Sequence, residues 1–161
     1  MAEALINLRA AERNLRIAAS SAGFLFDGEP AAADTVAAME ELGVDLRRHR
    51  SRMVTPAMVD AADLVITMER THARSLALED PGSADRIHTI GGAVAGLGAR
   101  ADEPIRDRIA RLGRERPAEQ LLGRGADEVD DPYGRPIRYH RRTAQHIDRL
   151  TSELVDVLAG S

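Results

Sequence analysis

The sequence contains no cysteine, no tryptophan and no lysine, and only four of its 161 residues are tyrosine or phenylalanine. The absence of cysteine excludes disulfide bonds, thiolate metal sites and a thiol nucleophile from these residues. All 22 basic residues are arginine. The histidines do not follow H-E-x-x-H or another metal-ligand spacing, and they stand at positions 49, 72, 88, 140 and 146. We therefore expect neither a metal nor a cofactor.

Charge and hydropathy set the class of protein. The net charge is −4 with both signs interleaved, so there is no basic stripe of the kind that binds DNA or RNA. No apolar run reaches the roughly 20 residues that span a bilayer, and the first residues do not resemble a signal peptide. With 43% hydrophobic residues the chain can build a core. We expect one cytoplasmic domain over residues 1–161, with neither nucleic acid nor a membrane as partner.

Hydrophobic spacing predicts helices that alternate with short strands. The clearest strand is the continuous apolar run at 64–68, which is typical of a parallel sheet covered on both faces. Thr55 followed by Pro56 predicts the N-terminus of a helix. This alternation predicts an α/β fold, a three-layer α/β/α sandwich with a short parallel sheet. Helices are expected at 1–14, 32–42, 55–61, 69–78, 104–112 and 137–158, and strands at 15–21, 64–68 and 86–90.

Four segments, in this order, resemble the low-molecular-weight protein-tyrosine-phosphatases, a family whose arsenate reductase relatives share the fold. Residues 1–5 (MAEAL) are similar to the residues directly after the catalytic C-x5-R-S-P loop of the family, and 21–23 (SAG) to the end of its second strand. Residues 62–69 (ADLVITME) look like its third strand, and 131–133 (DPY) like its general-acid loop. The stretch from Gly43 to Pro56 fits as well.

The resemblance implies roles for two residues. Asp131 matches the general acid that protonates the leaving phenolate oxygen, and Tyr133 matches a residue that flanks the substrate ring. A plain Asx-type turn is the other interpretation of this segment, and Asp130 is a second candidate for the acid. Glu69 stands where the family often carries an acid, but it also suits the first turn of a helix.

The chain also departs from the family. Residues 91–126 form a longer and looser stretch than in compact members, either a lid or a surface excursion. Gly134 stands where many members carry a second aromatic residue. The loop with the cysteine nucleophile and the phosphate-binding arginine would precede Met1, as would the first strand, which is central in the sheet of the family. We expect the phosphate loop and this strand to be missing and the chain, as given, to be inactive.

Three interpretations stay open. The chain is a version of an active phosphatase, shortened by a start codon placed too late. It is a pseudo-phosphatase that acts as a binding module. Or it is an arsenate reductase relative, which the absence of resolving cysteines disfavours. The resemblance implies a phosphotyrosine protein or a small aryl phosphate as substrate, and strands without neighbours imply self-association.

Overall fold

The computed structural model describes residues 1–98, 103–116 and 125–160. These residues form two compact units. Unit 1 consists of Met1–Val54 and Asp131–Val155, and unit 2 of Thr55–Asp130 and Asp156–Ser161. The single domain over residues 1–161 stays a prediction.

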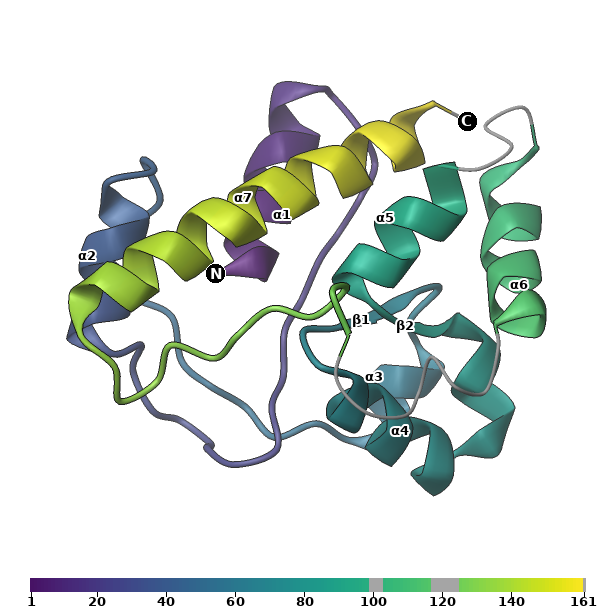
Figure 1. Cartoon of the computed structure of the whole chain (residues 1–161), viewed down its shortest axis with the longest axis horizontal. Coiled ribbons are helices and arrows are strands. Elements are labelled where there is room, and N and C mark those ends of the chain that lie inside the picture. The colour runs from purple at the N-terminus through teal and green to yellow at the C-terminus, as the bar shows by residue number, and fades with distance from the viewer. Residues whose placement is uncertain (99–102, 117–124, 161) are drawn as a thin grey trace. The chain divides into compact units, whose positions relative to one another are not determined.

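Unit 1 is built from helices (Figure 1). It contains α1 (Ala2–Glu12), α2 (Ala33–Glu40) and most of α7 (Ile137–Ala159), which confirms three of the predicted helices. The apolar stripe of α7 is buried as its spacing predicts, and α1 buries Leu5 completely. Arg9 of α1 pairs with Asp148 of α7 at 2.6 Å, which ties the two helices together. The fully or almost fully buried apolar residues of this unit are Leu5, Ala10, Ala38, Met39, Ala144, Leu154 and Val155.

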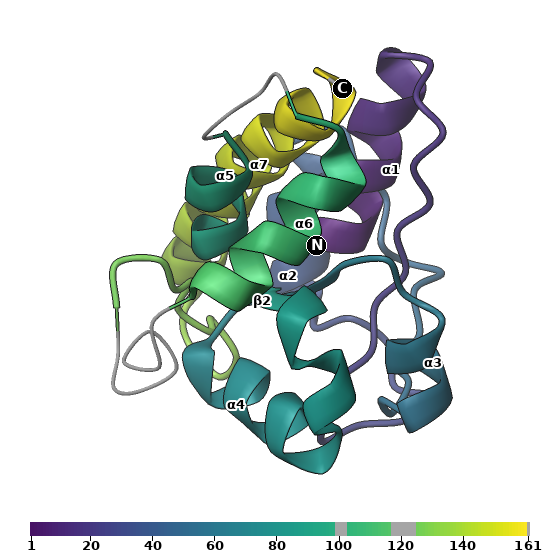
Figure 2. The same cartoon turned by 90° about the vertical axis from the view of Figure 1, so that its right-hand side faces the viewer.

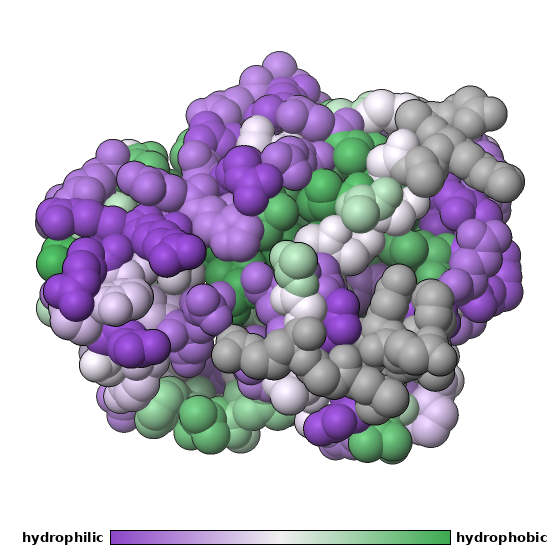
Figure 3. All heavy atoms as spheres, in the orientation of Figure 1, coloured by the Kyte–Doolittle hydropathy of each residue, from purple (hydrophilic) through white to green (hydrophobic). Residues whose placement is uncertain are grey.

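The outer side of this unit is polar. On the face shown in Figure 3, hydrophilic residues dominate over α2 and the first half of α7. Arg141 of α7 forms a two-pronged ion pair with Glu41 at the end of α2, with a closest distance of 2.7 Å. Both side chains are about half exposed, so this pair fixes the geometry of the two helices more than it adds to stability.

The predicted strand at 15–21 is the one element of unit 1 that does not form. The segment leaves α1 as an unpaired trace (Figure 1), and no ladder of hydrogen bonds runs along it. Its residues still alternate between half-buried and exposed, as in a strand. The prediction was wrong because a strand also needs a neighbour, and among the described residues only isolated bridges join this region, at Gly23 with Met53 and Pro30 with Arg50.

Unit 2 holds a parallel sheet of two strands. β1 (Val65–Thr67) pairs with β2 (Ile87–Thr89) in the register Val65 to Ile87. The strands lie between α4 (Arg70–Glu79) and α5 (Ile90–Gly98), as Figures 1 and 2 show. The remaining elements are α3 (Pro56–Asp60), the 3-10 helix η1 (Pro81–Arg86) and α6 (Ile105–Glu115), which packs on α5 and η1. The expected α/β class with a short parallel sheet is confirmed.

The sequence predicted some of the helices of unit 2 and missed another. The hydroxyl of Thr55 accepts a hydrogen bond from the Met58 amide, and Pro56 opens α3, as predicted. Helix α5 was not predicted, because glycines punctuate its sequence. A Cβ on Gly91 would lie 2.8 Å from the backbone of Asp127, so this glycine permits close packing within a helix. Parts of the loose region 91–126, at 99–102 and 117–124, lie outside the described residues.

The interior of unit 2 contains polar side chains. His88 is buried, its Nε2 lies 3.0 Å from the Asp85 carbonyl oxygen, and its Nδ1 faces the guanidinium of Arg116. Because the carbonyl can only accept, Nε2 carries the proton. Asp127 accepts hydrogen bonds from Arg70 and Thr89.

Among the helices of the described residues, none combines the length and the apolar character that a membrane span requires.

Candidate functional site

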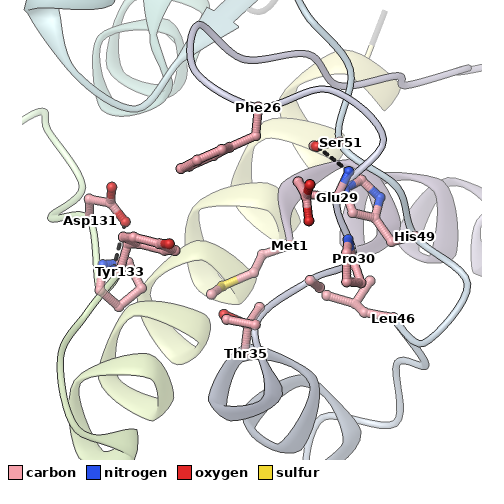
Figure 4. A pocket seen from close by; sticks show the side chains of 13 residues that line it. Met1, Phe26, Glu29, Pro30, Thr35, Leu46, His49, Ser51, Asp131 and Tyr133 are labelled. Carbon is pink, nitrogen blue, oxygen red and sulfur yellow. Dashed lines mark hydrogen bonds between the residues drawn. The ribbon is translucent and has the colours of Figure 1, made fainter.

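A cavity of about 280 Å³ lies within unit 1 (Figure 4). Three segments surround it: the loop after Gly23, the start of α2 with the stretch at 46–51, and the segment 131–133 that precedes α7. Residues far apart in the sequence therefore meet at one place. The lining residues are Met1, Phe26, Glu29, Pro30, Ala31, Ala32, Thr35, Leu46, His49, Ser51, Asp131, Pro132 and Tyr133.

The loop that carries Phe26 is held by backbone hydrogen bonds to its neighbour at 51–53. The Gly28 amide donates to the Ser51 carbonyl, and the Ser51 amide donates to the Glu29 carbonyl, each at 2.8 Å. The side chain of Ser51 accepts a third bond, from the Glu29 amide at 3.0 Å. Gly28 has a φ of 75°, which glycine adopts without strain. The loop is therefore a defined turn, and it fixes the position of Phe26.

The segment that carries Asp131 is an Asx turn. The Asp131 Oδ1 atom accepts a hydrogen bond from the Tyr133 amide at 2.9 Å (Figure 4), and the Arg135 amide donates to the Pro132 carbonyl at 2.9 Å. The side chain of Asp131 is exposed, and its Oδ2 atom has no partner among the described residues. The turn thus leaves one carboxylate oxygen free for a ligand.

Gly134 has a φ of 72°, and a residue with a side chain would be strained there. The segment therefore supplies one aromatic residue to the cavity, Tyr133.

Phe26 and Tyr133 face each other across the mouth of the cavity (Figure 4). Their ring centroids lie 5.7 Å apart at an interplanar angle of 40°, a favourable tilted arrangement. Both rings are largely exposed, at 45% and 66%. A planar ring that enters between them needs a separation of about 7 Å, twice the usual stacking distance. The two rings must therefore part before an aryl group can stack between them.

His140 connects the two sides of the cavity. It is buried, and its Nε2 donates to the Arg135 carbonyl at 3.1 Å while its Nδ1 lies 3.0 Å from the Thr35 hydroxyl. The Nε2 N–H is the donor because the carbonyl oxygen can only accept. The start of α2 is thereby joined to the turn that follows Tyr133.

Asp131 and Tyr133, to which the resemblance gives roles, line the same cavity, whereas Glu69 does not line it and stands at the N-cap of α4. Asp130 is not a lining residue. Phe26 was not predicted, because the loop contacts that place it opposite Tyr133 involve residues more than 20 positions away. The scarcity of aromatic residues was the available signal: two of the four in the chain meet here.

The charge of the cavity is unfavourable for a phosphate. Among the described residues, the ionisable side chains that line it are Glu29, His49, Asp131 and Tyr133, and none is an arginine. A phosphate dianion needs arginine or several amide donors, so the residues described here do not form a phosphate site. The described residues also contain no group of three His, Asp or Glu side chains that could hold a metal. The cavity can receive an aromatic ring and present a carboxyl group to it.

Residues 1–104 match the family described as low molecular weight phosphotyrosine protein phosphatase. The chain belongs to this family. Residues 131–133 lie beyond the matched range, so the roles of Asp131 and Tyr133 stay predictions.

Individual relatives support the same family. The probable low molecular weight protein-tyrosine-phosphatase EpsP of Ralstonia solanacearum is 30% identical over 91 residues, which are 56% of this chain and 61% of that protein. The match thus covers less than two thirds of the curated relative. A low molecular weight protein tyrosine phosphatase from T. tengcongensis superimposes with a TM-score of 0.73 at 27% identity, over 96% of this chain and 87% of that one.

A mutant of YwlE from Bacillus subtilis has a similar fold, with a TM-score of 0.75 at 24% identity, over 98% of this chain and 88% of that chain. At this identity the likeness concerns the fold alone.

Proposed function

We propose that these residues supply the acid and ring-binding part of a phosphatase site for phosphotyrosine or other aryl phosphates. Asp131 is the general acid and Tyr133 one wall for the substrate ring. The observation that carries this proposal is the cavity at which a free carboxylate oxygen and an aromatic pair meet. Family membership supports the reaction class.

The proposed reaction has two steps. A cysteine thiolate attacks phosphorus, the bond between phosphorus and the phenolic oxygen breaks, and Asp131 gives its proton to the leaving oxygen. Water then attacks the cysteinyl phosphate, and Asp131 takes up a proton from that water as the sulfur leaves. Pro132 restricts the turn that aims the carboxyl group.

The nucleophile of this reaction is not among the 161 residues, because they contain no cysteine. Loss of a nucleophile removes most of the rate of an enzyme of this kind, since catalytic groups act as a unit. We therefore propose that the 161 residues alone do not turn over aryl phosphates. A C-x5-R-S-P segment joined ahead of Met1 would supply the thiolate and the phosphate ligands; we refer to that longer protein as the loop-bearing chain.

A binding module for phosphotyrosine is the second candidate, and the aromatic pair of Phe26 and Tyr133 favours it. The charge of the cavity argues against it, because Glu29 and Asp131 repel a phosphate and no lining arginine attracts one. An arsenate reductase relative would need cysteines that these residues lack. Self-association and a cytoplasmic location stay predictions.

The ring-binding role of Tyr133 is tested in the loop-bearing chain. The substitution Tyr133→Ala should raise KM for an aryl phosphate by roughly two- to tenfold, because an aromatic contact contributes about 0.5–1.5 kcal/mol. The kcat value should change little, and Tyr133→Phe should restore KM. Tyr139→Ala is the matched control, because that ring lies beneath Arg135 and Arg138, at 4.9 Å from each guanidinium. Equal KM values for Tyr133→Ala and the parent would contradict the role.

A further inference from the structure

Two arginine-rich segments of unit 1 stand beside the cavity. Residues 47–52 (RRHRSR) and 135–142 (RPIRYHRR) contain four arginines each and no acidic residue, in a chain whose net charge is −4. The first segment contributes His49 and Ser51 to the cavity wall, and the second begins two residues after Tyr133. Positive charge is therefore concentrated next to the cavity, although no arginine lines it among the described residues.

Most of these arginines have no carboxylate that neutralises them. Within the described part of the chain, Arg47 pairs with Asp45 at 2.8 Å and Arg141 pairs with Glu41 at 2.7 Å. No other described carboxylate forms an ion pair with either segment. The arginines that remain without a carboxylate are all exposed, and they are Arg48, Arg50, Arg52, Arg135, Arg138 and Arg142.

In the first segment, uncharged groups hold two of these guanidiniums in place. The Nη1 atom of Arg50 donates to the carbonyl oxygens of Arg47 and His49, at 3.1 and 2.7 Å. The Nε atom of Arg52 donates to the Ser21 carbonyl at 2.6 Å. These bonds direct the two side chains but do not neutralise them, and their other N–H groups have no partner among the described residues.

In the second segment, an aromatic ring holds two guanidiniums. Arg135 and Arg138 each place the guanidinium carbon 4.9 Å from the centre of the Tyr139 ring, a cation–π distance. Helix α7 begins at Ile137 without an acidic residue in its first turn, so a positive charge there opposes the helix dipole. Arginines close together also repel one another. Negative charge from a bound partner would offset both costs.

The two segments reach the cavity from opposite sides. In Figure 4, His49 and Ser51 lie on one side of it, and Asp131 and Tyr133 lie on the other. The carboxylates of Glu29 and Asp131 belong to the cavity itself. The surface is therefore positive on both flanks and acidic in the middle.

We propose that the two segments bind acidic side chains of a protein substrate, on either side of the tyrosine whose ring enters the cavity. The proposal rests on the proposed function, which places that ring at Tyr133. Clusters of arginine bind carboxylates through charge-assisted hydrogen bonds and recognise acidic motifs in peptides. A peptide with carboxylates around an uncharged ring matches the order of charges, whereas a nucleic acid would also bring phosphates to Glu29 and Asp131, which repel them.

Binding of labelled peptides by the 161-residue protein, measured by fluorescence anisotropy, tests the proposal. The probe carries a central tyrosine with two glutamates on each side, and its controls carry glutamine or lysine in their place. We expect the acidic peptide to bind roughly tenfold more tightly than the glutamine peptide, and the lysine peptide not to bind, because several weak ion pairs add up. Salt at about 1 M should remove the preference. Equal affinity of the acidic and glutamine peptides would overturn the proposal.

Matched double substitutions locate the binding surface. Arg50→Gln with Arg138→Gln removes one charge from each segment and should reduce the preference for the acidic peptide from roughly tenfold to about two- to threefold. Arg74→Gln with Arg114→Gln changes the net charge by the same amount at exposed arginines of unit 2 and should keep the preference. Circular dichroism verifies each fold. An equal loss in both double variants would show attraction by net charge alone and overturn the proposal.

Two further probes identify the partner. An oligonucleotide with four phosphates carries the charge of the acidic peptide and should bind more weakly; affinity equal to that of the peptide would overturn the assignment to a protein. Alanine in place of the central tyrosine of the peptide should weaken binding by roughly two- to tenfold. Unchanged binding would separate the arginines from the cavity and contradict the proposal. Turnover by the loop-bearing chain decides the proposed function and does not enter these measurements, so the two proposals fail separately.

Discussion

Substitution of Asp131 by asparagine in the loop-bearing chain should lower kcat for phenyl phosphate by roughly a hundred- to ten-thousandfold, the usual contribution of a general acid. The reason is the poor leaving group: phenolate has a high proton affinity and needs a proton as its bond to phosphorus breaks. For an aryl phosphate with a nitro-substituted ring the leaving group is already stabilised, so the same substitution should cost much less. The ratio of the two losses, measured by steady-state kinetics, identifies the acid.

The neighbouring carboxylate provides the control for this experiment. Asp130→Asn changes the same charge one residue away but does not touch the cavity, so its kcat should stay within a few-fold of the parent for both substrates. If Asp130→Asn shows the large loss and Asp131→Asn does not, the roles of the two residues are exchanged. If neither variant depends on the leaving group, the segment is a structural Asx turn and carries no acid.

The stability of the protein should fall as the pH is lowered from about 6.5 to about 4, with His88 as one identifiable cause. Burial lowers the pKa of His88 from 6.5 to about 4, and the guanidinium of Arg116 acts in the same direction. Between these two pH values the unfolded chain takes up a proton on this residue that the folded chain does not. The contribution of His88 to the free energy of unfolding is therefore fully present above pH 6.5, and up to about 3 kcal/mol of it is lost as the pH falls to about 4.

A variant that cannot titrate at this position isolates the effect. His88→Gln keeps an N–H donor for the Asp85 carbonyl but has no ionisable group, so its free energy of unfolding should depend less on pH over the same interval. Urea unfolding of both proteins at several pH values gives the difference directly. Parallel curves for the two proteins between pH 6.5 and 4 would show that His88 does not control this loss.

The elements that the sequence predicted well are those whose signals are local. Thr55 and Pro56 by themselves indicate the start of a helix, and the spacing of the apolar residues in α7 by itself indicates which face of that helix is buried. The predicted strand at 15–21 shows the limit, because pairing depends on a partner and not only on alternation within the segment. Helix α5 shows another limit. Glycine in a sequence usually indicates a loop, but Gly91 lies in a helix because the backbone of Asp127 approaches it closely, and such a tertiary contact cannot be predicted from local sequence.

The site was predictable to the extent that a short motif carried it. The residues at 131–133 resemble a known loop, and the structure places Asp131 and Tyr133 at one cavity. Phe26 escaped prediction because its place opposite Tyr133 depends on hydrogen bonds between the loop around Gly28 and Ser51. A sequence with 22 arginines gave no sign that none of the described ones would line the cavity.

We propose that these residues hold the acid and the ring wall of a phosphatase site without its nucleophile. The decisive measurement is hydrolysis of an aryl phosphate by the 161-residue protein beside the loop-bearing chain, with both folds verified by circular dichroism. We predict turnover by the loop-bearing chain and none above background by the 161-residue protein. Appreciable turnover by the 161-residue protein would contradict the claim and require a nucleophile other than cysteine.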